Sequence, residues 1–235
     1  MHTPLSGKWA LVTGSTRGIG QQIAIGLARL GANLIVHGRT HAAAEETVSR
    51  LEEFPGEVQV VAGDLGTTEG VEAVIREVED KVGGIDILYN NAAISHAPES
   101  VWDQSRELWD RVFQVNVFAL VRLCQAFGPG MKARKWGRIV NLTSGIADQP
   151  DLAVYSVSKA AVDKFTRDLA VECKDSGVLV NHVDPGWLRT DLGGPNAWDP
   201  VERVLPGALV PVLLPDDGPS GRFFAAADYK MLALP

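Results

Sequence analysis

A tyrosine and a lysine stand four residues apart, at Tyr155 and Lys159, in the stretch AVYSVSKAAVDKFTRDLAVE. The stretch has the apolar spacing of an amphipathic helix, where residues four apart are neighbours on one face. A free tyrosine has a pKa of about 10, which is too high for acid–base work near neutrality. A lysine ammonium one turn away should favour the phenolate and lower that pKa. The pair is therefore a candidate proton donor and acceptor. The alternative is a packed tyrosine beside a lysine that faces water.

A glycine-rich turn, TGSTRGIG at residues 13–20, directly follows the first apolar run of the chain. Such a turn lets the backbone approach a pyrophosphate, and the helix after it offers N–H groups and a positive dipole end. Glycine spacing alone is weak support because any tight turn can need glycine. Its place between a predicted strand and helix favours a dinucleotide site. The expected contacts are Gly14, Ser15, Arg17, Gly18, Ile19 and Gly20.

The end of the second predicted strand indicates which dinucleotide is bound. It carries Arg39, and no carboxylate follows until Glu45. An acidic residue at this place would accept hydrogen bonds from the ribose of NAD, whereas arginine can pair with a 2′-phosphate. Arg17 approaches from the glycine turn, so NADP(H) is favoured. The alternative is that both arginines are solvated surface residues. His37 is expected at most to pack against adenine.

Short apolar runs alternate with helix-length segments whose apolar residues recur every three or four positions. This alternation predicts parallel strands covered on both faces by helices. We therefore expect a single α/β domain over residues 1–235, with a Rossmann-like, doubly wound, seven-stranded and mostly parallel sheet. The seven runs are residues 8–14, 32–38, 57–65, 85–92, 137–144, 178–186 and 220–226.

The Gly- and Pro-rich segment 188–219 follows the sixth predicted strand. Loops at the carboxyl ends of parallel strands bind ligands, so this segment is expected to form a substrate lid, with a short helix around 200–210. A long helix is expected over 105–128, with Cys124 as a small buried residue. His182, within the sixth strand, is expected to be structural and satisfied by backbone or water.

Bulk composition excludes several classes of partner. The 235 residues carry a net charge of −7, which does not attract nucleic acid or acidic membranes. The two cysteines form no disulfide or zinc pattern, and no metal is expected. The first twelve residues lack the features of a signal peptide. No apolar run approaches the roughly 20 residues needed to span a bilayer, so a cytoplasmic location is expected.

These motifs resemble those of the classical short-chain dehydrogenases/reductases, over roughly residues 7–190. The matching motifs, in the family's order, are TGSTRGIG, NNAA (90–93), Asn116, Ser144, Tyr155-x-x-x-Lys159 and DPGWLRT (184–190). The resemblance implies that Ser144 hydrogen-bonds the substrate oxygen and that Tyr155 donates or accepts the proton. It also implies that Lys159 holds the nicotinamide ribose and tunes Tyr155, and that Asn116 anchors a proton-relay water.

The resemblance also extends the expected binding sites. Asp64 could lie near the adenine amino group, although an aspartate at a strand end is also a common turn residue. Thr190 could bind the cofactor's carboxamide. The further cofactor contacts are Leu65, Asn91, Ala92, Tyr155, Lys159, Pro185, Gly186 and Leu188. The expected substrate contacts are Ser144, Ile146, Tyr155 and Trp187, with Leu188, Pro150, Ala153 and His96 as further candidates. Most of these are apolar, which favours a hydrophobic ketone or aldehyde, and His96 could equally face water.

Two departures from the family pattern bear on binding and assembly. Ala93 replaces a glycine of the usual NNAG motif, which should alter the cofactor's fit without abolishing binding. The tail LPDDGPSGRFFAAADYKMLALP lacks the longer end of tetrameric members and resembles that of carbonyl-reductase-type members. A homo-oligomer, dimeric or tetrameric, is expected, and a monomer stays open.

The favoured function is an NADP(H)-dependent oxidoreductase that interconverts a ketone or aldehyde and an alcohol by hydride transfer. Its partner would be a small-molecule carbonyl or alcohol substrate, and Ser144 could polarise the oxygen that Tyr155 protonates. One alternative is a catalytically silent NADP(H)-binding regulator. The other is an epimerase or dehydratase that uses the same tyrosine and leaves the cofactor's redox state unchanged overall.

Overall fold

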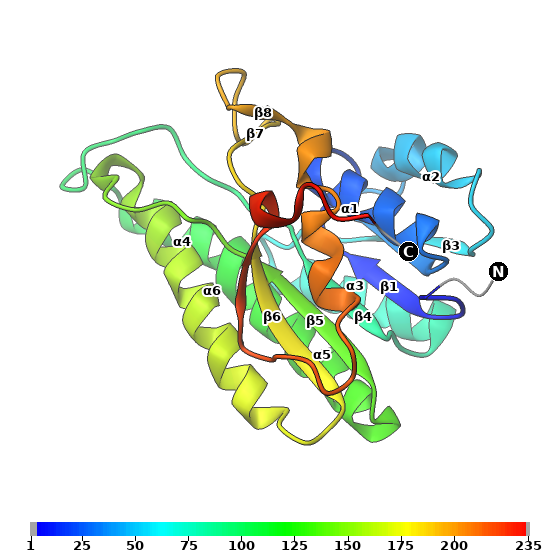
Figure 1. The fold of residues 1–235 in the computed structure, drawn as a ribbon. Coiled ribbons are helices and arrows are strands. Elements are labelled where there is room, and N and C mark those ends of the chain that lie inside the picture. Colours follow the sequence, from blue (N-terminus) through cyan, green and yellow to red (C-terminus); the bar gives the residue numbers. More distant parts are fainter. Residues whose placement is uncertain (1–3, 234–235) are drawn as a thin grey trace.

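Seven parallel strands form the central sheet of the computed structural model, which describes residues 4–233 (Figure 1). Their order across the sheet is β3-β2-β1-β4-β5-β6-β9, and each neighbouring pair is parallel. The predicted Rossmann-like α/β fold is confirmed, and each of the seven apolar runs contains one strand. The strands are β1 (Trp9–Val12), β2 (Asn33–Gly38), β3 (Val58–Ala62), β4 (Ile87–Asn90), β5 (Gly137–Leu142), β6 (Val178–Asp184) and β9 (Phe223–Ala225).

Helices cover both faces of this sheet (Figure 1). Adjacent strand residues point to opposite faces, so Val12 packs in the apolar layer with α1 and Leu11 in the layer with α3, α5 and α6. The α-helices are α1 (Gly18–Arg29), α2 (Glu45–Leu51), α3 (Thr68–Val82), α4 (Arg106–Phe113), α5 (Ala119–Arg134) and α6 (Ala153–Glu172). Short 3₁₀ turns are Ala42–Ala44, Pro150–Leu152, Val201–Val204, Gly207–Val212 and Ala226–Tyr229.

The strand order reverses between β1 and β4. From β1 the chain continues to β2 on one side of this pair, and from β4 it continues to β5 on the other side. At such a point the loops after the carboxyl ends of the strands diverge and open a crevice for ligands. The glycine turn follows β1 and the NNAA segment follows β4. The fold therefore brings together the two segments that the sequence assigns to the cofactor.

The helix expected over 105–128 runs further, because α4, a π-helical turn at Gln114–Phe118 and α5 are continuous to Arg134. By length and composition alone, Arg106–Arg134 could cross a membrane, although 44% of its most apolar window is buried within the protein. Leu120, Leu123 and Phe127 pack into the core layer, and so does Cys124, as predicted. The packing identifies α5 as a core helix of this fold.

The predicted lid at 188–219 divides into two parts with different surroundings. Its first part carries the short paired strands β7 (Leu188–Arg189) and β8 (Asp199–Pro200) and is mostly exposed (Figure 1). Its second part packs into the core, where Leu209 and Val212 are buried and Tyr89 Oη donates to the Ala208 carbonyl at 2.8 Å. The helix expected around 200–210 occurs as two 3₁₀ turns. The buried second part is therefore part of the core, and a role of the exposed first part as a lid stays a prediction.

Candidate active site

The turn between β1 and α1 forms a cradle that only glycine fits. Gly14 and Gly18 have φ of 63° and 59°, in the left-handed region. A Cβ at Gly20 would lie 2.3 Å from the Gly14 carbonyl oxygen. No described side chain caps α1, and its first turn holds no acidic residue. The amide groups at this end thus suit a phosphate, and the residues present fit the pyrophosphate of a dinucleotide.

Thr13 and Asn91 brace this cradle across the switch point. The Thr13 hydroxyl accepts hydrogen bonds from the backbone N–H groups of Asn91 and Ala92, both at 3.0 Å. Asn91 Nδ2 donates to the carbonyls of Thr13 and Gly14 at 2.8 and 3.2 Å. The Asn91 amide is therefore engaged by the protein itself. The sequence reasoning missed Thr13, whose position at the end of β1 was the available signal.

His37 supports the glycine turn from behind. It is 3% exposed, its Nδ1 accepts from Gly14 N at 2.9 Å, and its Nε2 donates to the Gly63 carbonyl at 3.1 Å. The prediction that His37 packs against adenine is therefore wrong, because the ring lies inside the protein. Ser15 is fully buried, and its N–H and hydroxyl both bond to the His37 backbone. Ser15 therefore holds the turn against β2, and its contact with the cofactor stays a prediction.

Acid should destabilise the fold through His37. Burial lowers the pKa of His37 from 6.5 to about 4, so the folded chain favours the neutral ring. The stability that this preference contributes is fully present above pH 6.5, the pKa of the ring in the unfolded chain. As pH falls from about 6.5 to 4, up to about 3 kcal/mol of unfolding free energy should be lost. In His37→Asn the amide oxygen can still accept from Gly14 but does not titrate, so the variant should lose less unfolding free energy over that range. Urea unfolding of both proteins at pH 7 and at pH 4.5 measures the two losses. An equal loss in both proteins would contradict this account.

The two arginines expected at a 2′-phosphate have different surroundings. Arg39 is exposed and makes no ion pair with any of residues 4–233. Arg17 Nε pairs with Asp191 Oδ2 at 2.7 Å, which ties the glycine turn to the lid segment. In the same place, Thr190 Cγ2 would lie 3.5 Å from a Cβ at Gly18. Among the described residues, Arg39 is thus free of ion pairs, whereas Arg17 is already paired with Asp191.

Four other expected cofactor residues differ in their burial and hydrogen bonds, and their contact with a cofactor stays a prediction. Asp64 is exposed, and its Oδ1 accepts from Gly66 N at 2.9 Å, so it acts at least as a turn residue. The side chains of Leu65 and Leu188 are buried in the core at 5% and 4% exposure. Only their backbones can reach a ligand. Gly186, at φ 83°, donates its N–H to Asp184 Oδ1 at 2.9 Å.

The predicted reacting residues meet beside the carboxyl end of β5. Lys159 is 4% exposed, and its Nζ lies 5.7 Å from the centre of the Tyr155 ring. The same Nζ donates to the carbonyl of Leu142, the last residue of β5, at 2.9 Å. Ser144 follows two residues later, and its hydroxyl accepts from Ile146 N at 3.2 Å. Lys159 therefore points into the protein, as the catalytic interpretation requires.

The electrostatics of the pair differ from the prediction. Burial raises the pKa of Tyr155 to about 12, against the opposing effect of a hydrogen bond to Ser144. Burial also lowers the pKa of Lys159 to about 8, although the Asp163 and Asp184 carboxylates oppose that change. The expected lowering of the Tyr155 pKa is therefore wrong, because burial of the phenol outweighs the hydrogen bond to Ser144 and the Asp184 carboxylate raises the pKa further. Tyr155 is thus protonated at neutral pH and ready to donate.

Asn116 lies in the π-helical turn between α4 and α5, a type of turn that is frequent at functional sites. Its Oδ1 accepts from Ile94 N, and its Nδ2 donates to the Ile94 carbonyl, both at 2.9 Å. Nδ2 also donates to the Ser158 hydroxyl at 3.0 Å, which in turn donates to the Tyr155 carbonyl. Asn116 thus connects the loop after β4 to the helix that carries Tyr155. Its role with a relay water stays a prediction.

The candidate substrate contacts Trp187, Ile146 and His96 are all at least partly exposed. Trp187 is 46% exposed, and its ring meets that of Trp198 edge to face at 5.4 Å. Trp187 Nε1 donates to the Gly193 carbonyl at 2.8 Å, which fixes the indole on the lid. His96 is half-buried, and its Nε2 has no hydrogen-bond partner within residues 4–233. Substrate contact by Trp187, Ile146 or His96 stays a prediction.

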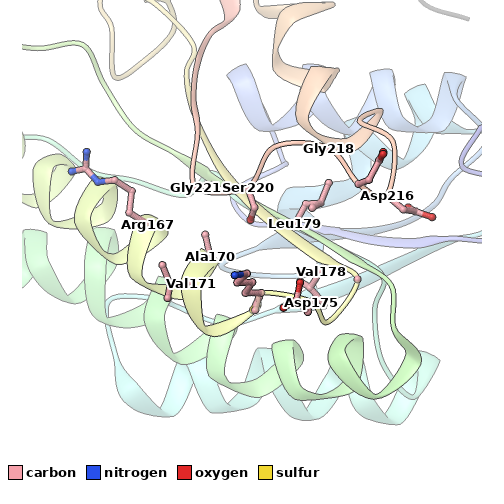
Figure 2. Close-up of a pocket in the computed structure, with 14 residues that line it drawn as sticks. Arg167, Ala170, Val171, Asp175, Val178, Leu179, Asp216, Gly218, Ser220 and Gly221 are labelled. Carbon is pink, nitrogen blue, oxygen red and sulfur yellow. The ribbon is translucent and has the colours of Figure 1, made fainter.

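A groove of about 680 Å³ lies elsewhere, between the end of α6, the start of β6 and residues 216–221 (Figure 2). Arg167, Val178 and Asp216 line it. Val178 is the first residue of β6, so the groove opens at the amino end of the strand. Ligands of parallel sheets bind at the carboxyl ends, and the groove is therefore separate from the Tyr155 centre.

Within residues 4–233, no group of three or more His, Cys, Asp or Glu side chains is placed to hold a metal ion.

The chain is similar to known proteins in both sequence and fold. A sequence profile of the short chain dehydrogenase family matches residues 8–199. The chain is 34% identical to a D-beta-hydroxybutyrate dehydrogenase of Cupriavidus necator, over 98% of this chain and 90% of that protein. It is also 34% identical to 3beta-hydroxysteroid dehydrogenase 1 of Eggerthella lenta, over 97% and 90% of the two chains. A gluconate 5-dehydrogenase of Burkholderia cenocepacia, solved with NADP and tartrate, superposes with a TM-score of 0.83 at 26% identity, covering 99% and 98%.

These likenesses, with the cradle and the sheet, define an oxidoreductase built on a Rossmann-like fold. The chain belongs to the short chain dehydrogenase family.

Proposed function

We propose that this chain is an NADP(H)-dependent oxidoreductase that interconverts a ketone or aldehyde and an alcohol, with Tyr155 as the proton donor and acceptor. The observation that carries the proposal is the placement of a protonated Tyr155 beside a buried Lys159 and the Ser144 hydroxyl. A glycine cradle that fits a dinucleotide follows β1 of the same sheet. Packing alone would not require a buried ammonium next to a tyrosine.

Each residue has a distinct task in the proposed reaction. The bound cofactor supplies or accepts the hydride. Ser144 donates a hydrogen bond to the substrate oxygen and polarises the carbonyl. Tyr155 delivers its phenolic proton to that oxygen as negative charge develops, and the Lys159 ammonium then stabilises the phenolate. In alcohol oxidation the same proton returns to Tyr155, so one residue serves both directions.

NADP(H) is the proposed cofactor because Arg39 is free of ion pairs among the described residues and exposed at the end of β2. Arg17 provides a second guanidinium once it leaves Asp191. The gluconate 5-dehydrogenase that shares this fold contains NADP, which is in line with this choice. The names of the relatives point to a hydroxy acid and a steroid, so a carbonyl or secondary alcohol is proposed without a narrower substrate. We further propose that the protein forms a homo-oligomer and is located in the cytoplasm.

The test is a panel of ketones, aldehydes and alcohols, followed by nicotinamide absorbance with NADPH and with NADH. We expect turnover with at least one carbonyl and a faster rate with NADPH. Binding of NADPH without turnover of any panel member would favour a silent regulator instead. Conversion of a substrate without net change in absorbance would favour an epimerase or dehydratase.

Arg39→Ala should separate the two cofactors. Loss of a charge-assisted fork to phosphate should weaken NADPH binding by about ten- to a hundredfold and leave NADH nearly unchanged. Titration calorimetry with each cofactor measures both values. Arg50→Ala is the matched control, because Arg50 is exposed and pairs only with Glu46 on its own helix. Equal weakening of NADPH and NADH in Arg39→Ala would contradict the assignment.

A further inference from the structure

A second polar cluster lies next to Lys159 and has no task in the reaction described so far. Asp163 stands one helical turn after Lys159 on α6, and its Oδ1 accepts from His182 Nδ1 at 2.6 Å and from the Thr143 hydroxyl at 2.5 Å. His182, on β6, is 3% exposed, and its ring packs edge to face on Phe223 of β9 at 5.5 Å. Since a carboxylate only accepts, the Nδ1 proton is on His182. The sequence prediction that His182 is structural missed this side-chain partner.

The cluster and Lys159 hold the same short segment of backbone. Lys159 Nζ bonds the carbonyl of Leu142, and Asp163 bonds the side chain of Thr143, the next residue. Ser144 follows immediately. Two successive turns of α6 therefore fix the backbone that presents Ser144 to the substrate.

Asp163 is one of two carboxylates that act on the Lys159 ammonium. On α6, residues four apart share a face, which places Asp163 and Tyr155 on either side of Lys159. Asp184, at the end of β6, is the second carboxylate, and β5 contributes only the Leu142 carbonyl. Asp163 itself faces His182 on β6, Thr143 after β5 and Arg167 on α6.

The charges of this cluster favour a protonated Lys159. Burial lowers the pKa of Lys159 to about 8, and Asp163 is the first group that opposes this change. Burial raises the pKa of the Asp163 carboxyl, but the hydrogen bonds from His182 and Thr143 outweigh it and hold that pKa below its usual range. Asp163 is therefore charged at neutral pH, where Lys159 needs a counter-charge.

We propose that Asp163, oriented by His182 and Thr143, is a positioning residue that keeps the Lys159 ammonium charged beside Tyr155. The inference rests on the proposed function, because a charged Lys159 is useful there for holding the ribose and stabilising the phenolate. A purely structural tie between α6, β5 and β6 would leave the titration of Lys159 unchanged. The two roles are thus distinguishable by experiment.

The test follows the titration of Lys159 directly, by NMR of the full chain labelled with ¹³Cε-lysine. The Lys159 signal is the one missing from Lys159→Met. In Asp163→Asn we expect its titration midpoint to fall by about one pH unit, because an opposite charge has been removed. Asp168→Asn is the matched control, since Asp168 is exposed on the same helix and pairs only with Lys164. It should leave the midpoint in place.

An unchanged Lys159 midpoint in Asp163→Asn would overturn the proposal. If that variant does not fold, Asp163→Ser, which can still accept from His182 and Thr143, replaces it with the same expected shift. Failure of both neutral variants to fold would make the cluster a folding element and would also overturn the proposal. The NMR experiment needs no substrate, so a shifted midpoint without carbonyl turnover would reject the proposed function alone. If the parent chain turns over a carbonyl, the alkaline limb of its kcat–pH profile should shift to lower pH in Asp163→Asn, by the same amount as the Lys159 midpoint.

Discussion

Tyr155→Phe should lower kcat by between about a hundredfold and ten-thousandfold, the range that a general acid supplies. The substitution removes one oxygen and keeps the ring that packs beside Lys159. NADPH affinity should therefore stay within about twofold of the parent chain, since no direct charge on the cofactor is lost. Steady-state rates with the best carbonyl, together with calorimetric titration of NADPH, measure both quantities.

Tyr229→Phe provides the matched control for this prediction. Tyr229 lies in the last 3₁₀ turn and packs against Phe224, far along the chain from the reacting centre. It should keep full activity. Retention of full turnover by Tyr155→Phe with every carbonyl tested would remove Tyr155 from the mechanism.

Lys159→Met should affect both catalysis and cofactor binding. The ammonium is buried, and its loss removes the charge that stabilises the Tyr155 phenolate and the expected bond to the nicotinamide ribose. We expect kcat to fall at least about a hundredfold and NADPH affinity to weaken about tenfold or more. This combined effect distinguishes Lys159 from Tyr155, whose replacement should spare binding.

Lys164→Met is the control for Lys159→Met, because Lys164 lies on the same helix but is 68% exposed and pairs with Asp168. It should match the parent chain in both rate and NADPH affinity. If Lys159→Met bound NADPH as tightly as the parent, Lys159 would have no role at the ribose. Its effect would then be confined to Tyr155.

Much of the fold was predictable because each local pattern agrees with the tertiary arrangement. Every predicted strand run contains one strand of the parallel sheet. The glycines of the cradle and the Tyr155–Lys159 spacing are local signals, and the structure uses both locally. The segment 188–219 was less predictable, because its Gly and Pro residues are typical of an exposed loop. Leu209 and Val212 in this segment are nevertheless buried, which depends on its packing against the sheet.

The partners of the buried histidines could not be predicted because they are distant in sequence. His37 meets Gly14 across 23 positions and His182 meets Asp163 across 19. The Tyr155 pKa had the wrong expected direction for a related reason. The spacing shows only that Tyr155 and Lys159 are neighbours, whereas the burial that raises the Tyr155 pKa is set by the whole fold.

Deuterium transfer tests the central claim most directly. NADPH labelled with deuterium at C4 of the nicotinamide, in each of its two stereoisomers, is incubated with the best carbonyl substrate, and the alcohol is analysed by mass spectrometry. The proposed function predicts one deuterium on the carbinol carbon from one stereoisomer, in step with NADPH oxidation, and almost none with Tyr155→Phe. An alcohol or other product without deuterium from either stereoisomer, formed at the full rate, would contradict it.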